Sequence, residues 1–171
     1  ADRLVYADLR AALGGEIELF ISGGDSLSVE LCATFHGMGL PIFEGYGLTE
    51  TAPVVSVNPP EEPQVGTVGP PLLNVDTRLD TTVDFDGFDS DSADSAAETG
   101  ELLVRGPNVT DGYWRRPGST EAAFVSRGDD HDWFRTGDLI EQGSDGYLTF
   151  RGRRKELIVL STGRNVVPGP I

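Results

Sequence analysis

The sequence of 171 residues predicts an α/β fold followed by a β-rich subdomain. Residues 17–43 read as strand, helix and strand, a succession that builds a parallel-type sheet with helices. After Pro53 the pattern changes to short apolar segments between glycine and proline turns, which is typical of a β-rich unit. Hydrophobic residues make up 38% of the chain, enough for a core of ordinary size, so wholesale disorder is not expected.

Two helices are predicted in the first part of the chain. Leucines at near-helical intervals through residues 4–13 meet Gly14 and Gly15, which are expected to end the first helix. Either Asp25 or Ser26 is expected to cap the start of the second helix. That helix is predicted from apolar residues four, four and three positions apart, namely Leu27, Leu31, Phe35 and Met38.

Strands are expected on both sides of the second helix and throughout the later half. Residues 17–22 alternate apolar and polar before a Gly-Gly turn, and residues 41–43 follow the helix. In such a sheet ligands bind at the carboxyl ends of the strands, where the glycine loops of this sequence lie. The β-rich part is predicted to contain strands at residues 66–69, 75–79, 101–105, 133–141 and 147–150.

The charge balance and the cysteine count exclude several kinds of site. Lys plus Arg number 13 and Asp plus Glu number 28, and the resulting net charge of −15 disfavours nucleic acid as a partner. With a single cysteine, Cys32, and two separated histidines, His36 and His131, neither a disulfide nor a zinc cluster is expected. No apolar run approaches the roughly 20 residues that span a bilayer, and no signal-like segment opens the chain, so a cytoplasmic location is expected.

The acidic residues are spread along the chain, which favours a halophile-like surface over a local acidic partner site. One stretch, between Arg78 and Arg105, contains many acids and no basic residue in a Ser-, Thr- and Ala-rich background. We expect a solvated hairpin loop there. A calcium site is the lesser alternative, because the stretch lacks the ligand spacing and the glycine of an EF-hand.

The segment with the most chemical possibilities follows the predicted strand at 41–43 and reads Glu44-Gly45-Tyr46-Gly47-Leu48-Thr49-Glu50-Thr51. Its glycines let the backbone approach a ligand, and Tyr46 offers a flat face to a purine. The Thr49 hydroxyl can bond a phosphate oxygen, and Glu50 is a hard oxygen ligand suited to Mg²⁺. Taken alone, the segment is equally compatible with a strand-ending turn, because it is neither G-x-G-x-x-G nor a Walker loop.

Five motifs occur in order and together cover nearly the whole chain. They are SGGDSL (22–27), GYGLTET (45–51), GELLVRGPNVTDGYW (100–114), RTGDL (135–139) and GRRKELIVLSTGRNVVP (152–168). The ordered set resembles the adenylate-forming superfamily and is most similar to long-chain fatty acyl-CoA synthetases. The resemblance implies that residues 1–151 form the later part of the large AMP-binding domain, and that residues 152–171 form the hinge and the start of the small C-terminal domain.

The resemblance implies a two-step ligation that uses ATP, Mg²⁺ and CoA. A fatty carboxylate attacks the α-phosphorus of ATP and expels pyrophosphate, and the CoA thiolate then displaces AMP from the acyl-adenylate. These small molecules are the expected partners, with peripheral membrane contact of the parent protein as a further option. Two alternatives stay open: a ligase for another carboxylate, such as an aryl acid, a short acyl chain or an amino acid, and a non-catalytic remnant or interaction module.

The resemblance gives the segment after the 41–43 strand a nucleotide-binding role in which Thr49 and Glu50 carry the catalysis. Thr49 matches the family's phosphate-contacting threonine, and Glu50 matches the acid that holds Mg²⁺ between the phosphates. Tyr46 matches the aromatic residue that stacks on adenine. The other members of the segment that are expected to bind the nucleotide are Glu44, Gly45, Gly47 and Leu48.

The loop before the second helix is also implicated by the resemblance. Gly24, Asp25 and Ser26 match the loop that shapes the adenine slot, and the same residues fit a helix N-cap after a turn. Both interpretations can hold together. The segment superficially resembles a nucleophile elbow, yet Ser28 stands where the second glycine of G-x-S-x-G belongs, which disfavours a serine-hydrolase role for Ser26.

Four later residues complete the expected site and hinge. Asp138 matches the acid that accepts hydrogen bonds from both ribose hydroxyls, and a turn aspartate bonded to its own backbone is the alternative. Arg153 matches the arginine that reaches ribose and phosphate, a task that suits its planar, permanently charged side chain. Lys155 matches the hinge residue, with a plain strand-edge position as the alternative, and Asn165 is a weaker candidate for nucleotide contact.

Two elements of the superfamily are missing from this sequence. The Ser/Thr/Gly-rich loop that embraces the β- and γ-phosphates belongs before Ala1, and the lysine that assists adenylation belongs beyond Ile171. We therefore expect the parent protein to be an enzyme and this segment alone to make little acyl-adenylate. The acyl pocket belongs mostly to the upstream part, so residues 1–171 do not specify the acyl-chain length.

Overall fold

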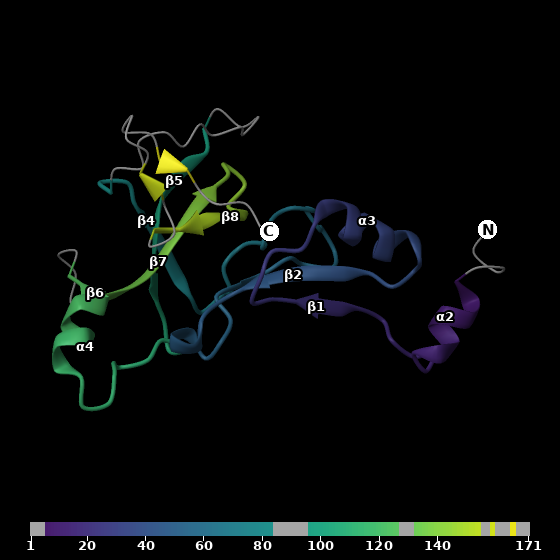
Figure 1. Cartoon of the computed structure of the whole chain (residues 1–171), viewed down its shortest axis with the longest axis horizontal. Coiled ribbons are helices and arrows are strands. Elements are labelled where there is room, and N and C mark those ends of the chain that lie inside the picture. Colours follow the sequence, from purple (N-terminus) through teal and green to yellow (C-terminus); the bar gives the residue numbers. More distant parts are fainter. Residues whose placement is uncertain (1–5, 84–95, 127–131, 155–157, 160–164, 167–171) are drawn as a thin grey trace.

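The computed structural model describes residues 6–83, 96–126, 132–154, 158–159 and 165–166, arranged as a small helix-covered sheet beside a curved sheet (Figure 1). The first part contains α2 (Ala7–Ala12), β1 (Phe20–Ser22), α3 (Val29–Gly37), β2 (Ile42–Tyr46), the 3₁₀-helix η1 (Thr49–Thr51) and β3 (Ser56–Val57). The second contains β4 (Asp76–Asp80), β5 (Glu98–Arg105), α4 (Pro117–Ala123), β6 (Phe124–Val125), β7 (Trp133–Gln142) and β8 (Leu148–Arg153), and a separate pair is formed by β9 (Ile158–Val159) and β10 (Asn165–Val166). The α/β class with a β-rich second part is confirmed.

The small sheet is mixed rather than purely parallel. β1 and β2 run parallel, with Ile21 opposite Phe43, and β3 joins the other edge of β2 in the antiparallel direction. A parallel pair requires a crossover connection, and α3 supplies it. The ring of Phe35 on α3 packs edge-on against Phe20 of β1, with the ring centroids 6.2 Å apart. The predicted helix end at Gly14 and Gly15 is also confirmed, because both have positive φ, at 93° and 76°, directly after α2.

The start of α3 differs from the prediction. Ser28, not Asp25 or Ser26, is the N-cap residue, and its side-chain oxygen accepts a hydrogen bond from the Leu31 N–H at 3.1 Å. A capping side chain must stand directly before the first helical turn to reach the free N–H groups. Asp25 and Ser26 lie too early in the loop for that, so the expected cap was wrong.

β2 is longer than the strand predicted at residues 41–43. It continues through Glu44 and Gly45 to Tyr46, so the first three of the eight residues of the glycine-rich segment are strand rather than turn. The reason is the pairing with β3, which contributes backbone hydrogen-bond partners that a local sequence pattern does not reveal.

Residues 66–69 form a loop and not the predicted strand. Gly69 has φ of 77° and makes only an isolated bridge to Leu148. A Cβ atom at Gly69 would lie 2.1 Å from the carbonyl oxygen of Val57. Close approach of two backbone segments therefore explains this glycine, because no residue with a side chain fits that position.

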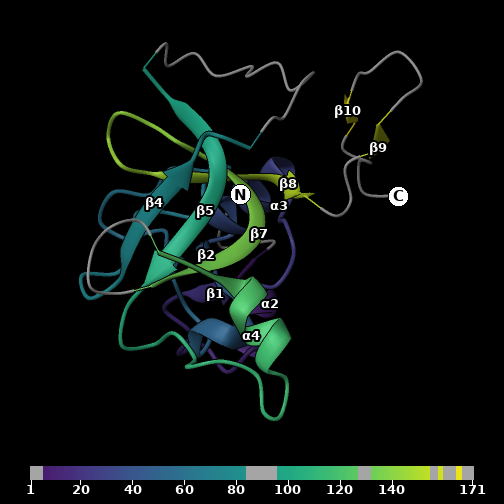
Figure 2. The same ribbon diagram turned by 90° about the vertical axis from the view of Figure 1, so that its left-hand side faces the viewer.

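The curved sheet is antiparallel, and Figure 2 shows the bend of β5 and β7. Its strand order is β4-β5-β7-β6, and β8 pairs with the end of β7 while β6 pairs with its beginning. The four strands predicted at 75–79, 101–105, 133–141 and 147–150 are confirmed with shifted or extended bounds. β4 and β5 form the predicted hairpin, whose residues 84–95, with the calcium alternative, lie outside the described residues.

Several short elements, among them α4, β3 and β6, have no counterpart in the sequence prediction. α4 begins with Pro117 at its first turn and contains no buried residue, so it has no apolar periodicity to indicate a helix. β3 and β6 are too short for alternation to be recognised. None of the helices in the described part of the chain is long and apolar enough to cross a bilayer.

A single apolar core joins the two sheets. It consists of the buried side chains of Tyr46, Val55, Val75, Leu102, Val104, Ile140 and Leu148. Tyr46 belongs to β2, whereas most other members belong to the curved sheet, so burial holds the carboxyl end of β2 against β5, β7 and β8. By contrast, α2 buries no residue, and Leu9 and Leu13 are each 42% exposed.

Replacing Leu102 by alanine is expected to lower the free energy of unfolding by about 2–5 kcal/mol, because this fully buried side chain would leave a cavity. Leu73→Ala is the matched control, since Leu73 is fully exposed and its loss should cost less than about 0.5 kcal/mol. Urea denaturation of both variants measures the difference. Similar losses for the two leucines would contradict the assigned core.

Candidate functional site

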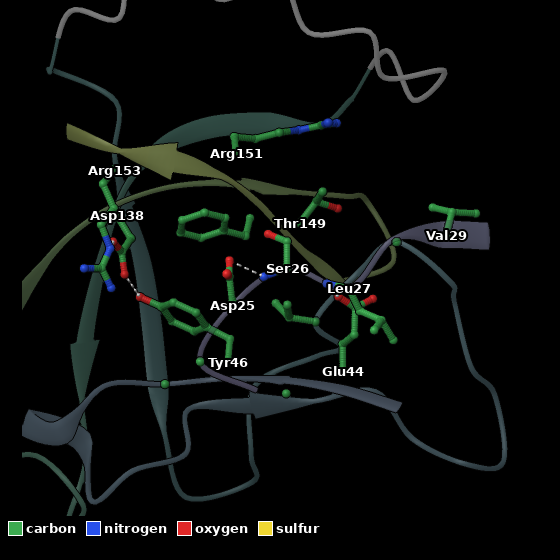
Figure 3. Close-up of a pocket in the computed structure, with 16 residues that line it drawn as sticks. Asp25, Ser26, Leu27, Val29, Glu44, Tyr46, Asp138, Thr149, Arg151 and Arg153 are labelled. Atoms are coloured by element: carbon green, nitrogen blue, oxygen red, sulfur yellow. Dashed lines mark hydrogen bonds and ion pairs between the residues drawn. The ribbon is translucent and has the colours of Figure 1, made fainter. Parts of the chain in front are cut away.

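A cavity of about 520 Å³ opens where the two sheets meet (Figure 3). Its wall consists of the loop after β1, the end of β2, the loop between β3 and β4, and strands β7 and β8. The lining residues are Gly24, Asp25, Ser26, Leu27, Val29, Glu44, Gly45, Tyr46, Gly47, Gly66, Val68, Asp138, Thr149, Phe150, Arg151 and Arg153. The cavity lies at the carboxyl ends of the parallel pair β1 and β2, which is where sheets of this kind bind ligands.

Three residues that are far apart in the sequence meet in this cavity. The Tyr46 hydroxyl donates a hydrogen bond to Asp138 Oδ2 at 2.7 Å, and Arg153 Nε lies 3.2 Å from Asp138 Oδ1. Asp138 and Arg153 are direct partners in the β7–β8 register, so the strand pairing itself brings their side chains together. Asp138 is 2% exposed, and a carboxylate at that depth needs charged or hydrogen-bonding partners.

Burial strengthens the Tyr46–Asp138 contact. Removal from water raises the pKa of Tyr46 well above its ordinary value, and the negative charge of Asp138 raises it further. Tyr46 therefore stays a neutral phenol that donates a hydrogen bond to the carboxylate at any physiological pH. Its ring also packs near Phe150, with the centroids 6.4 Å apart.

The loop of Gly24, Asp25 and Ser26 forms the wall facing these residues. Asp25 Oδ1 accepts a hydrogen bond from the Ser26 N–H at 2.8 Å. Glu44 Oε1 accepts a hydrogen bond from the Leu27 N–H at 3.1 Å and thereby ties this loop to β2. No histidine is among the described residues that line the cavity, so the lining offers Ser26 no imidazole base.

Gly47 ends the part of the glycine-rich segment that borders the cavity. A Cβ atom at this position would lie 1.7 Å from the carbonyl oxygen of Pro53, so only glycine allows the chain to turn there. Gly45 is less restricted, because its Cβ atom would lie 3.3 Å from the carbonyl oxygen of Ser56.

The structure does not bring Leu48, Thr49 and Glu50 into the lining of the cavity. Leu48 packs against the apolar core, and Thr49 is exposed at the start of η1. Glu50 Oε1 accepts a hydrogen bond from the Tyr113 hydroxyl at 2.8 Å. These residues lie beyond Gly47 on the same loop, next to the cavity but outside its wall.

The Glu50 carboxylate is suited to a hard metal ion, because carboxylate oxygens are hard ligands. Among the described residues, no three His, Cys, Asp or Glu side chains gather into a metal site of their own. Mg²⁺ needs no such cage, because it commonly binds through one or two carboxylates plus substrate phosphates and waters. Within the described part of the chain, Tyr113 reaches only Oε1 of Glu50, which leaves Oε2 for such a ligand.

Two predicted residues at the end of the chain cannot be placed at the cavity. Lys155, the expected hinge, lies outside the described residues, and for Asn165 only the backbone position in β10 is described. β8 includes Gly152 and Arg153, so the start of the expected small domain pairs with β7. The boundary at residue 152 stays a prediction.

Sequence reasoning missed several residues of the cavity wall. Thr149, Phe150 and Arg151 come from β8, and Gly66 and Val68 come from the loop between β3 and β4. The signal for the first three was available, because strands were expected at 133–141 and 147–150, and pairing them as a hairpin places β8 beside Asp138. Nothing local in the sequence marks Gly66 or Val68.

Comparison with known proteins agrees with this architecture. The model of the family described as AMP-binding enzyme matches residues 2–114. The chain is 42% identical over 167 residues to the long-chain fatty acid–CoA ligase FadD15 of Mycobacterium bovis, and the match covers 98% of this chain and 24% of that protein.

Two solved structures have the same fold over most of the described chain. The O-succinylbenzoate coenzyme A synthetase MenE of Bacillus subtilis, in complex with ATP and magnesium ion, matches with a TM-score of 0.69 and 28% identity over 95% of this chain and 33% of that one. A malonyl-CoA ligase with methylmalonyl-CoA and AMP bound matches with a TM-score of 0.67 and 35% identity, and the match covers 92% of this chain and 32% of that one. The chain thus spans about a quarter to a third of the proteins that it matches.

Tyr46→Phe is expected to lower the free energy of unfolding by about 1.5–3 kcal/mol at neutral pH, because the buried Asp138 carboxylate loses a hydrogen-bond donor. The raised pKa of folded Tyr46 stabilises the protein below the ordinary tyrosine value of 10.0, and this stabilisation is lost as the pH rises above it. The difference in the free energy of unfolding between wild type and Tyr46→Phe should therefore become smaller above pH 10. Denaturation curves recorded over a range of pH measure this difference. Tyr147→Phe removes an exposed hydroxyl and should have a smaller effect at neutral pH; an equal effect would contradict the assignment.

Proposed function

Because this chain belongs to the AMP-binding enzyme family, we propose that it is part of an AMP-forming long-chain fatty acid–CoA ligase and contributes the AMP-binding half of the active site. The observation that carries the proposal is the meeting of Tyr46, Asp138 and Arg153 in one cavity.

The reaction proceeds in two steps that share this cavity. The fatty carboxylate attacks the α-phosphorus of ATP, a bond to that phosphorus forms, and pyrophosphate leaves. The CoA thiolate then attacks the acyl carbon, and AMP leaves from the acyl-adenylate. Both steps need a nucleotide held in a fixed orientation, since positioning supplies much of the rate of such transfers.

Asp138 and Arg153 orient the ribose. Asp138 Oδ2 accepts a hydrogen bond from the Tyr46 hydroxyl and Oδ1 pairs with Arg153, so the carboxylate is held in one orientation at the cavity, and a carboxylate is the acceptor that ribose hydroxyls require. Arg153 is half exposed toward the cavity and can add a charge-assisted contact to ribose or phosphate. The aromatic faces of Tyr46 and Phe150 and the loop at Gly24 to Ser26 are the proposed surroundings of the adenine.

Thr49 and Glu50 serve the phosphates beyond the cavity wall. Their position after Gly47 on the loop that leaves the cavity supports this role. Glu50 would hold Mg²⁺ through its free oxygen, and the ion would supply charge neutralisation to the phosphate oxygens. The Thr49 side chain, exposed at the start of η1, donates its hydroxyl to a phosphate oxygen.

The full-length ligase is expected to activate palmitate at least about tenfold better than acetate or benzoate, because the named relative acts on long-chain fatty acids. Acid-dependent exchange of pyrophosphate into ATP measures the first step for each acid. Assays at low and high salt control for the high negative charge of the chain. Equal or better turnover of acetate would reject the long-chain assignment.

Asp138→Asn in the full-length ligase is expected to raise the KM for ATP at least about tenfold, because an amide offers the ribose hydroxyls only one accepting oxygen. Asp76→Asn is the matched control, since Asp76 forms an exposed ion pair with Arg105 away from the cavity and should leave the KM within about twofold. Pyrophosphate exchange at varied ATP gives both values. An unchanged KM in a folded Asp138 variant would remove this residue from the nucleotide site.

A further inference from the structure

The loop at residues 108–113 is joined to η1 by three hydrogen bonds. Asn108 Nδ2 donates to the Thr51 carbonyl oxygen at 2.9 Å. The Thr110 N–H donates to the Glu50 carbonyl oxygen at 2.8 Å, and the Tyr113 hydroxyl donates to Glu50 Oε1 at 2.8 Å. Backbone and side chain of Glu50 are thus both fixed by a segment about 60 residues later in the chain.

Within the described residues, Tyr113 donates the one side-chain hydrogen bond that the Glu50 carboxylate accepts. It engages Oε1 at 2.8 Å, and no bond from Tyr113 reaches Oε2. A carboxylate bonded at one oxygen keeps a narrower range of rotamers than a free one. The bond from Tyr113 therefore restricts the orientations of the Glu50 carboxylate.

The backbone of Tyr113 is held against α4. Its backbone N–H donates to Oγ1 of Thr120, in the middle of α4, at 2.9 Å. Gly112 has φ of 141°, and a Cβ atom there would lie 2.5 Å from Thr120 Cγ2, so the chain can approach α4 only with glycine at this position. The Tyr113 side chain, which is 38% exposed, therefore reaches Glu50 from a backbone position that is fixed against α4.

We propose that Tyr113 is a positioning residue that holds the Glu50 carboxylate ready to receive Mg²⁺ with the ATP phosphates. The inference rests on the proposed function, in which Glu50 is the protein ligand of the metal. Tyr113 does not touch the metal or the substrate; it acts through Glu50, as hydrogen-bond partners of metal ligands commonly do.

Tyr113→Phe in the full-length ligase isolates this effect, because it removes one hydroxyl and keeps the ring. Tyr147→Phe is the matched control, since Tyr147 donates its hydroxyl to the Glu62 carbonyl oxygen on another loop. Calorimetric titration with ATP, in excess Mg²⁺ and in EDTA, separates metal-dependent from metal-independent binding. The Mg²⁺ concentration for half-maximal pyrophosphate exchange is the second measurement.

Tyr113→Phe is expected to weaken ATP binding about tenfold in Mg²⁺ and to leave binding in EDTA unchanged, a loss within the range seen when partners of metal ligands are removed. The half-maximal Mg²⁺ concentration should rise by a similar factor, with little change in kcat at saturating Mg²⁺. Tyr147→Phe should match wild type in every measurement. Equal weakening with and without Mg²⁺, no weakening, or tighter Mg²⁺ binding would overturn the proposal.

Glu50→Gln distinguishes a failure of this inference from a failure of the proposed function. If Glu50→Gln abolishes the Mg²⁺ dependence of binding while Tyr113→Phe behaves as wild type, Glu50 keeps its role and the positioning role of Tyr113 is rejected. If Glu50→Gln itself leaves the Mg²⁺ dependence intact, the metal role of Glu50 is wrong and the inference about Tyr113 falls with it.

Discussion

The buried carboxylate of Asp138 is the point on which the cavity depends. A charge that is 2% exposed is costly unless hydrogen bonds and opposite charge compensate it. The Tyr46 hydroxyl arrives from β2 and the Arg153 guanidinium from β8, while Asp138 stands on β7. Strands of two different sheets are therefore held at one place by one side chain, and the cavity opens at that place. The contacts that organise the site are also contacts that join the two parts of the fold.

A second buried carboxylate aligns the same strands. Glu101 on β5 is 2% exposed and pairs with Arg135 at 2.5 Å and with Arg154 at 3.4 Å. Arg135 precedes Asp138 on β7, and Arg154 directly follows Arg153. Glu101 thus holds β7 close to Asp138, and it holds the end of β8 close to Arg153. Breaking such a buried network by removing one partner is costly, which makes the relative position of β5, β7 and β8 well defined.

The sequence predicted the elements whose apolar pattern was strong and missed those defined by neighbours. The strands at 101–105 and 133–141 are confirmed, because their apolar residues alternate or cluster over several positions. The cap of α3 and the strand at 66–69 were wrong, because both depended on which of several polar or glycine positions the backbone would use. α4 escaped prediction because a short helix starting at Pro117 buries nothing.

The sequence by itself indicated the family, the kind of fold and the residue types suited to a nucleotide. Ordered motifs and hydrophobic periodicity are local features, so they can be recognised without a structure. The tertiary structure alone decided which of those residues share a space. It brings Tyr46, Asp138 and Arg153 together, adds Phe150, and leaves Thr49 and Glu50 outside the wall with Tyr113 beside them. The physical reason is that strand register and buried hydrogen bonds join positions up to 92 residues apart, and no local pattern encodes such distances.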